Sequence, residues 1–86
     1  MGSYSVFITQ SAVRELDGLP TAKIRRAIVQ RIMGLGEDPR PRGCTKLSGA
    51  DKYRLRQGRY RIVYSIQDDR LIVIVVRVAH RKDVVR

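Results

Sequence analysis

The residues best suited to chemistry in this sequence are the basic ones of its second half. From residue 40 to residue 61 the only acidic residue is Asp51, and it stands among many cations: Arg40, Arg42, Lys46, Lys52, Arg54, Arg56, Arg59 and Arg61. Arg54, Arg56 and Arg61 have the spacing that places side chains on one face of paired strands. Like charges this close repel each other, and an anionic ligand offsets that repulsion because guanidinium groups bind phosphates bidentately. The pattern predicts a polyanion-binding surface; the alternative is a solvated strand face whose arginine stems cover apolar surface.

His80 is the one histidine of the chain, and it stands at the end of an apolar run that predicts a buried strand. An imidazole exchanges protons near neutral pH, which makes His80 the obvious group for proton transfer. The alternative is an ordinary surface histidine without a chemical role.

Composition excludes several classes of protein. The 86 residues carry 18 Lys and Arg against 8 Asp and Glu, a formal net charge of +10. We expect a single domain, residues 1–86, because the chain is short and its apolar content of 43% is too high for a disordered tail. One cysteine, Cys44, cannot form an intramolecular disulfide, and with one histidine it cannot build a zinc site. Without a signal-peptide pattern or a membrane-spanning run, we expect a cytoplasmic protein that contacts no membrane.

The elements that must position these residues follow from a change in apolar periodicity. A β-branched and aromatic run predicts a strand over 4–9, and Ser11 is the expected N-cap of a short helix that ends at 17. A second helix is expected from Pro20, because apolar residues recur at spacings of three and four: Ile24, Ala27, Ile28, Ile32 and Leu35. Residues 36–52 indicate an extended connection. The period then becomes two, which predicts strands over 53–56, 60–66 and 71–78 joined by turns at 57–58 and 67–70.

These elements predict an α+β fold of one small domain in the order β-α-α-β-β-β. The N-terminal strand and two helices are expected to pack on one face of an antiparallel sheet, because the apolar stripe of the second helix needs a surface to bury. The opposite face then presents Arg54, Arg56 and Arg61. We expect the end of the last strand to bring three more residues beside them: Arg77, His80 and Arg81.

Three blocks of residues occur in order along the second half of the chain. The first is K-L-S-G at 46–49, the second is Y-R-L-R-Q-G-R-Y-R-I-V-Y at 53–64, and the third is H-R-K-D-V at 80–84. With these blocks and this order of elements, the chain resembles the RelE/ParE superfamily of toxins from bacterial toxin–antitoxin systems over essentially its whole length. The blocks are more similar to the RelE branch, the mRNA interferases, than to the gyrase-poisoning ParE branch.

The resemblance implies a ribosome-dependent endoribonuclease that cleaves mRNA in the A site, near 16S rRNA, without a metal or cofactor. In this transesterification the 2′-hydroxyl attacks the adjacent phosphate and the 5′-oxygen leaves, while fixed cations stabilise the phosphorane. Positions that match the RelE pattern imply the catalytic residues Arg54, Arg56, Arg61, His80 and Arg81. Neighbouring cations are expected to bind RNA: Lys46, Lys52, Arg59, Arg77 and Lys82.

Two features depart from the RelE pattern. Arg54 and Arg56 stand where RelE has lysines, and Arg54 is a poor general base because a guanidinium stays protonated. His80 is then the better base, unless rRNA or the surroundings of the 2′-hydroxyl supply that function. Val85 stands where the family commonly has a tyrosine, and loss of an acid–base group typically costs about 10²–10⁴ in rate. The resemblance therefore implies either a weak or altered nuclease, or a toxin in which this position was changed so that the protein could be produced.

The resemblance also implies a cognate antitoxin, acidic and helical, that covers the basic surface. Two other functions stay open. One is a ParE-like inhibitor that binds gyrase without chemistry of its own, and the other is a non-catalytic module that binds RNA or protein.

Overall fold

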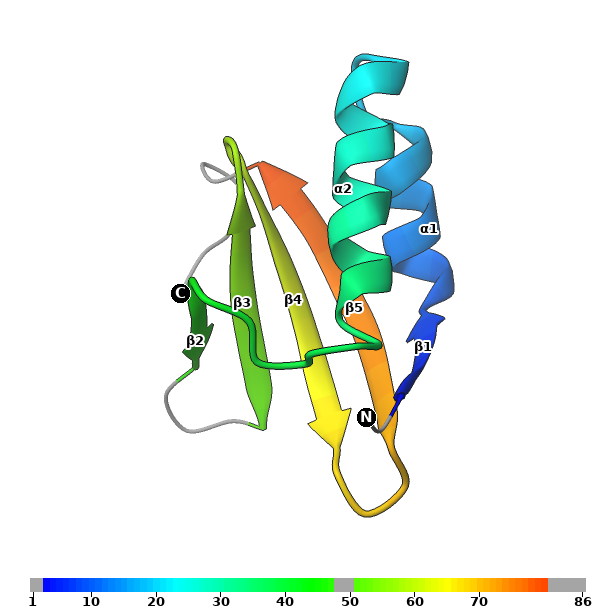
Figure 1. Ribbon diagram of the computed structural model, residues 1–86. Helices are drawn as coiled ribbons and strands as arrows, with labels where there is room; N and C mark the ends of the chain where they lie inside the picture. Colours follow the sequence, from blue (N-terminus) through cyan, green and yellow to red (C-terminus); the bar gives the residue numbers. More distant parts are fainter. Residues whose placement is uncertain (1–2, 48–50, 81–86) are drawn as a thin grey trace.

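The computed structural model describes residues 3–47 and 51–80, and its elements follow the predicted order with one added strand (Figure 1). In chain order they are β1 (Ser5–Ile8), α1 (Gln10–Asp17), α2 (Ala22–Gly34), β2 (Cys44–Lys46), β3 (Lys52–Gln57), β4 (Tyr60–Gln67) and β5 (Ile72–His80). The added strand is β2, which lies within the predicted extended connection. It pairs with β3 and forms an edge of the sheet.

The α+β class is confirmed, and the sheet is mixed rather than purely antiparallel. Its strand order is β1-β5-β4-β3-β2. β1 lies parallel to β5, with Val6 opposite Val73 and Ile8 opposite Val75, whereas the other neighbours are antiparallel. The N-terminal strand is thus part of the sheet and does not belong to the layer that covers it.

A threonine is the N-cap residue of each helix. Thr9 Oγ1 accepts a hydrogen bond from the Ala12 N–H at 3.2 Å, and Thr21 Oγ1 accepts one from the Ile24 N–H at 3.1 Å. These bonds satisfy N–H groups that have no partner within the helix. The first helix therefore begins before Ser11, its predicted N-cap, and the second begins after Pro20.

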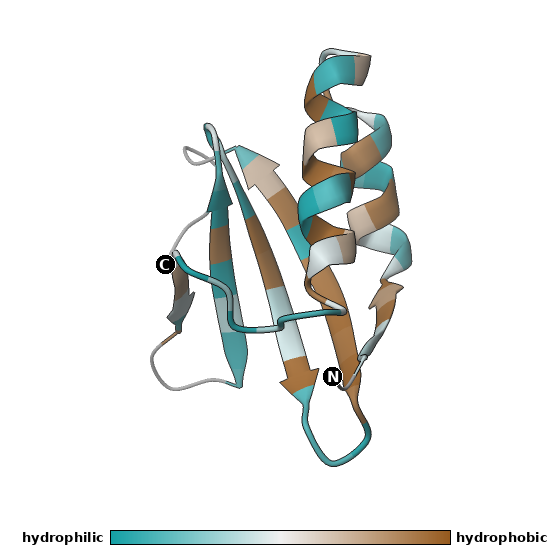
Figure 2. Ribbon diagram, viewed as in Figure 1, coloured by the Kyte–Doolittle hydropathy of each residue, from teal (hydrophilic) through white to brown (hydrophobic). Residues whose placement is uncertain are grey.

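The hydrophobic core lies between the helices and one face of the sheet. α1 and α2 lie side by side, with α1 packed on β5 and α2 contacting β3, and the segment after α2 crosses in front of β4 and β3 (Figure 1). Hydrophobic residues run along much of β5 (Figure 2). The core residues are Ala12, Leu16, Ile28, Ile32 and Leu35 on the helical side and Leu55, Ile62, Tyr64, Val73, Val75 and Val78 on the sheet. None of the described helices is long and apolar enough to span a membrane.

The alternation of core-facing and outward-facing residues in β5 shifts by one residue midway along the strand. Val73 and Val75 are buried, and so is Val78, which is an odd number of residues further on. In the ladder with β4, Tyr64 pairs with Val75 and Val63 pairs with Arg77, so Val76 is an extra residue in a β-bulge. The bulge explains why this strand does not alternate regularly between apolar and polar residues.

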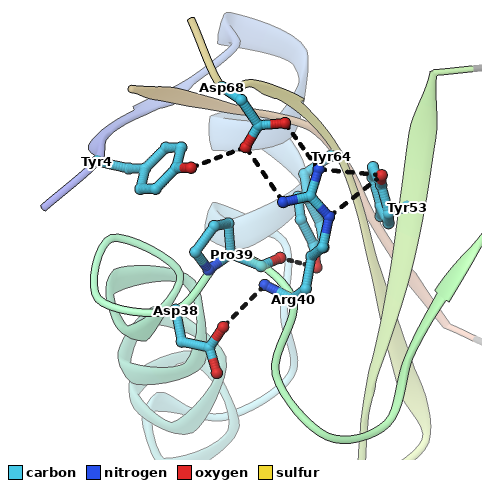
Figure 3. Close-up of polar contacts among 7 residues, drawn as sticks. All are labelled: Tyr4, Asp38, Pro39, Arg40, Tyr53, Tyr64 and Asp68. Atoms are coloured by element: carbon cyan, nitrogen blue, oxygen red, sulfur yellow. Dashed lines mark hydrogen bonds and ion pairs between the residues drawn. The ribbon is translucent and has the colours of Figure 1, made fainter. Parts of the chain in front are cut away.

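A polar network joins the segment after α2 to the turn between β4 and β5 (Figure 3). Arg40 contacts Asp68 through two nitrogens, Nη2 to Oδ2 at 2.8 Å and Nη1 to Oδ1 at 3.1 Å. The Arg40 guanidinium also lies 5.2 Å from the centroid of the Tyr53 ring, and the Tyr4 hydroxyl donates to Asp68 Oδ1 at 2.7 Å. Arg40, which belongs by sequence to the basic segment, therefore forms an ion pair with Asp68 that joins two parts of the fold.

Tyr64 anchors the same segment from within the core. Its side chain is fully buried, and its hydroxyl donates a hydrogen bond to the Pro39 carbonyl at 2.7 Å. Burial raises the pKa of the Tyr64 phenol well above its usual value, so this hydroxyl stays protonated and remains a donor.

The contact between Arg40 and Asp68 makes the stability of the fold depend on pH in the acid range. The hydrogen-bonded Arg40 guanidinium lowers the pKa of Asp68 from 3.8 to about 2. A carboxyl whose pKa is lower in the folded state stabilises the fold fully above its unfolded pKa, and this contribution is lost as the pH falls through the folded value. We expect Asp68→Asn to lower the Tm at neutral pH and to weaken the decline in Tm between about pH 4 and pH 2. Circular dichroism melts at stepped pH measure both effects.

Asp69→Asn is the matched control, because Asp69 is an exposed carboxyl in the same turn. It is expected to leave both the Tm and its acid dependence close to those of the unsubstituted protein. Equal losses of Tm in the two variants would contradict the role given to the Arg40–Asp68 pair.

Candidate nucleic-acid interface

Arginines of the β3–β4 hairpin lie on the sheet face opposite the helices. Arg56 is directly opposite Arg61 in the ladder, and Leu55 is directly opposite Ile62. Leu55 and Ile62 are buried in the core beneath the helices. Because side chains alternate along a strand, Arg56 and Arg61 must point to the other face. Arg54 is two residues from Arg56 and shares that face, as the sequence predicts.

The same face carries a further cation at the start of β3. Lys52 precedes Arg54 by two residues and is opposite Ser65 of β4. We call these four residues, Lys52, Arg54, Arg56 and Arg61, the basic face. Like charges directly opposite each other in a sheet repel, and an anionic ligand would offset the repulsion between Arg56 and Arg61.

Lys46 and Arg59 lie away from the basic face. Lys46 is exposed on the edge strand β2 and is opposite Tyr53, a residue packed against the core on the helix side. Arg59 is exposed in the turn between β3 and β4, and it lines a cavity that opens on the helix side. These two cations therefore do not belong to the basic face.

His80 lies on the helix side of the sheet, and the prediction that it stands beside the arginines of the open face is wrong. It is opposite Tyr60 in the ladder, and the two rings meet edge to face with their centroids 5.4 Å apart. Both rings line a cavity together with residues of α2, among them Ile28. Arg77 and His80 are separated by an odd number of residues on one strand, so their side chains point in opposite directions.

Two cavities of about 420 Å³ each meet at the Tyr60–His80 pair. One lies between α2 and the β3–β4 hairpin, and the other lies between the end of β5 and the loop that joins α1 to α2. The sequence blocks contain Tyr60, but nothing in their pattern indicates that its ring pairs with His80.

Arg77 is engaged in an ion pair at the edge of the sheet. β1 pairs with β5 only along 72–75, so the rest of β5 has no strand on its outer side within the described sheet. The Nε atom of Arg77 lies 3.3 Å from Oε2 of Glu15, a residue of α1. The register places Arg77 on the same face as Arg54, as predicted, because both are opposite Val63 of β4. RNA binding by Arg77 stays a prediction, and its Nε atom is engaged by a carboxylate at the sheet edge. The sequence gives no means of finding that Glu15 is the partner of Arg77.

Three predicted site residues, Arg81, Lys82 and Val85, lie outside the described residues. Within residues 3–47 and 51–80, no group of three or more His, Cys, Asp or Glu side chains is placed to hold a metal ion.

The sequence matches a family model described as the ParE toxin of the type II toxin–antitoxin system parDE, over residues 6–85. The chain belongs to the RelE/ParE superfamily. A curated relative of this toxin is Toxin RelG of Mycobacterium tuberculosis (strain ATCC 25618 / H37Rv). The two are 35% identical over 85 residues, which is 96% of this chain and 97% of RelG.

Solved structures of RelE toxins share the fold of this toxin. A chain of the RelBE2 toxin–antitoxin complex from M. tuberculosis has a TM-score of 0.80 and 35% identity, over 92% of this chain and 99% of that one. The archaeal RelE–RelB complex from Pyrococcus horikoshii OT3 gives 0.83 and 28%, over 95% and 99%. The isolated E. coli RelE toxin gives 0.77 and 26%, over 91% and 84%. The superfamily inferred from the three sequence blocks is confirmed.

If the basic face of this toxin binds RNA, its arginines will determine the salt dependence of binding. Each phosphate contact with a single strand adds about 0.7 to the slope of log K against log salt concentration. We expect Arg56→Gln and Arg61→Gln each to reduce the slope by about that amount. Fluorescence anisotropy of a labelled single-stranded RNA, titrated at several salt concentrations, measures it.

Arg70→Gln is the control, because Arg70 is an exposed arginine in the β4–β5 turn at the other end of the sheet. A reduction in slope as large for Arg70→Gln as for Arg61→Gln would show that RNA binding is spread over the whole cationic surface.

Proposed function

We propose that this toxin cleaves mRNA in the ribosomal A site, with Arg54, Arg56 and Arg61 around the scissile phosphate. The observation that carries the proposal is the Arg56–Arg61 pair, two arginines directly opposite each other in the ladder with Arg54 on the same face. In the reaction the 2′-oxygen forms a bond to phosphorus, the bond from phosphorus to the 5′-oxygen breaks, and a 2′,3′-cyclic phosphate remains. Negative charge gathers on the phosphoryl oxygens in the transition state, and fixed guanidinium groups stabilise it there.

The position of the two cavities, away from the basic face, supports dependence on the ribosome. The two cavities described above lie on the helix side, whereas Arg56 and Arg61 stand on the other face of the hairpin. An enzyme must hold its reacting atoms in a near-attack geometry, which is worth several orders of magnitude in rate. We infer that the ribosome holds the mRNA against the basic face, and that 16S rRNA phosphates also contact its cations.

The position of His80 affects the choice of general base. Its ring packs against Tyr60 on the helix side, whereas Arg61 points to the other side. A general base must lie within hydrogen-bond reach of the proton that it removes. We therefore propose that rRNA, or the surroundings of the 2′-hydroxyl on the ribosome, accept the proton, and that His80 has a lesser role than the arginines.

Single-turnover cleavage on programmed ribosomes tests this division of roles. Loss of one group that stabilises developing charge costs about 10²–10³ in kcat, and we expect a loss of that size for Arg61→Ala. We expect His80→Asn to retain most of the activity, and Arg70→Ala to serve as the control for lost charge. A loss in His80→Asn as large as that in Arg61→Ala would contradict the proposed roles.

Val85 provides a separate test of the proposed nuclease. If this position has lost an acid–base group, Val85→Tyr is expected to raise the cleavage rate, by up to about 10²–10⁴. Val85→Phe is the matched control because it adds the ring without the hydroxyl. Equal gains for Tyr and Phe would indicate base stacking rather than proton transfer.

We also propose that an acidic, helical antitoxin covers the basic face. The similar chains from M. tuberculosis and P. horikoshii were solved in toxin–antitoxin complexes. The formal net charge of +10 on this chain favours a partner of opposite charge and makes association sensitive to salt.

A second candidate function is inhibition of DNA gyrase, which is favoured by the family model because its description names a ParE toxin. This function needs no chemistry at the basic face. Supercoiling assays with purified gyrase separate the two candidates: a poison retains its effect in Arg61→Ala, and a ribosome-dependent nuclease leaves gyrase unaffected.

A further inference from the structure

Among the residues that the structure describes, the outer edge of β5 is paired with a strand at one end only. β1 accompanies β5 as far as Val75, but β5 continues to His80. Backbone N–H groups that are shielded from water need a hydrogen-bond partner, and on an unpaired strand edge the ladder does not provide one. Val78 is such a position, because the residue is only 2% exposed.

A carboxylate from α1 takes the place of the absent strand. Glu15 Oε1 accepts a hydrogen bond from the Val78 N–H at 2.7 Å, and Oε2 of the same group lies 3.3 Å from Arg77 Nε. α1 holds Glu15 in this position because Ala12 and Leu16, on the same side of the helix, are buried in the core. One side chain therefore fixes the backbone at one residue and the guanidinium at the preceding one.

The segment of β5 that Glu15 holds lies next to the arginines of the basic face. In the β4–β5 ladder Val78 is opposite Ile62, and Ala79 is opposite Arg61. Arg61 in turn is opposite Arg56 of β3. The end of β5 thus supports the strand that carries Arg61, on the side away from β3. Electrostatic catalysis depends on charges that are already in place before the reaction, so looseness in this segment would reduce the rate.

We propose that Glu15 is a positioning residue of this toxin, acting on the basic face through two separate contacts. Its hydrogen bond to Val78 holds the end of β5 against β4 and thereby holds Arg61 in place. The register places Arg77 on the side of the basic face, and its ion pair with Glu15 draws the guanidinium to the sheet edge toward α1, out of the RNA-binding set. The first contact bears on catalysis and rests on the proposed nuclease function, whereas the second bears on RNA binding and does not.

Two substitutions of Glu15 separate these contacts. Glu15→Gln keeps an oxygen that can accept the Val78 N–H and removes the charge that holds Arg77. Glu15→Ala removes both contacts. Both variants are expected to bind single-stranded RNA more tightly, with a salt slope steeper by about 0.7, because Arg77 is released. Only Glu15→Ala is expected to lose most of its cleavage activity, by up to about 10²-fold, since a small misplacement of a catalytic group has effects of this size.

The experiment measures three quantities for the wild type, Glu15→Gln, Glu15→Ala and Glu37→Ala. They are kcat on programmed ribosomes, the salt slope for a labelled single-stranded RNA, and the hydrogen-exchange rate of the Val78 amide by NMR. Glu37 is an exposed carboxyl after α2 and is the control for lost negative charge. We expect faster exchange at Val78 in Glu15→Ala than in Glu15→Gln, together with the greater loss of kcat.

The outcomes distinguish this inference from the proposed function. Unchanged exchange at Val78 and an unchanged RNA slope in both Glu15 variants overturn the inference, whether or not the wild type cleaves mRNA. A wild type that cleaves nothing removes the proposed nuclease, and the exchange and binding data still decide whether Glu15 positions β5 and Arg77. If Glu15→Ala does not fold, a steeper RNA slope in Glu15→Gln supports the Arg77 contact and an unchanged slope overturns it.

Discussion

The burial of Leu55 and Ile62 beneath the helices is the constraint on which the rest of the structure depends. These two residues are opposite each other in the β3–β4 ladder and are fully buried. Because side chains alternate along a strand, their burial turns Arg54, Arg56 and Arg61 to the opposite face. The hydrophobic core therefore produces a cluster of like charges that electrostatics alone would disperse. A shift of the register by one residue would exchange the two sets of side chains and destroy both the core and the basic face.

The two ends of the sheet are stabilised in different ways. At the end near the β4–β5 turn, Arg40 and Asp68 pair with opposite charges, and Tyr4 and Tyr53 complete the network (Figure 3). At the other end, Arg56 and Arg61 face each other with like charge. The first end contributes stability, and the second holds the charges that the proposed function uses. Proteins commonly give up local stability in this way at sites of binding and catalysis.

Local patterns in the sequence predicted the hairpin and its charges well, because a period of two is sufficient to assign residues to faces. The parallel pairing of β1 with β5 could not be predicted, since it joins the two ends of the chain and has no local signal. The added strand β2 was hidden among glycines and prolines. The opposite orientation of Arg77 and His80 was within reach, because their odd separation on one strand implies it. The roles of Glu15 and Asp68 depend on contacts distant in sequence, and nothing in their surroundings indicates them.

The central claim is that the cations of the basic face stabilise attack of a 2′-hydroxyl on the neighbouring phosphate of ribosome-bound mRNA. Mass spectrometry of the new 3′ ends, from mRNA cleaved on programmed ribosomes by this toxin, tests the claim most directly. The account predicts a 2′,3′-cyclic phosphate at the cleaved position, and none where the scissile nucleotide lacks its 2′-hydroxyl. A 3′-hydroxyl end, or equal cleavage of the 2′-deoxy substrate, would contradict it.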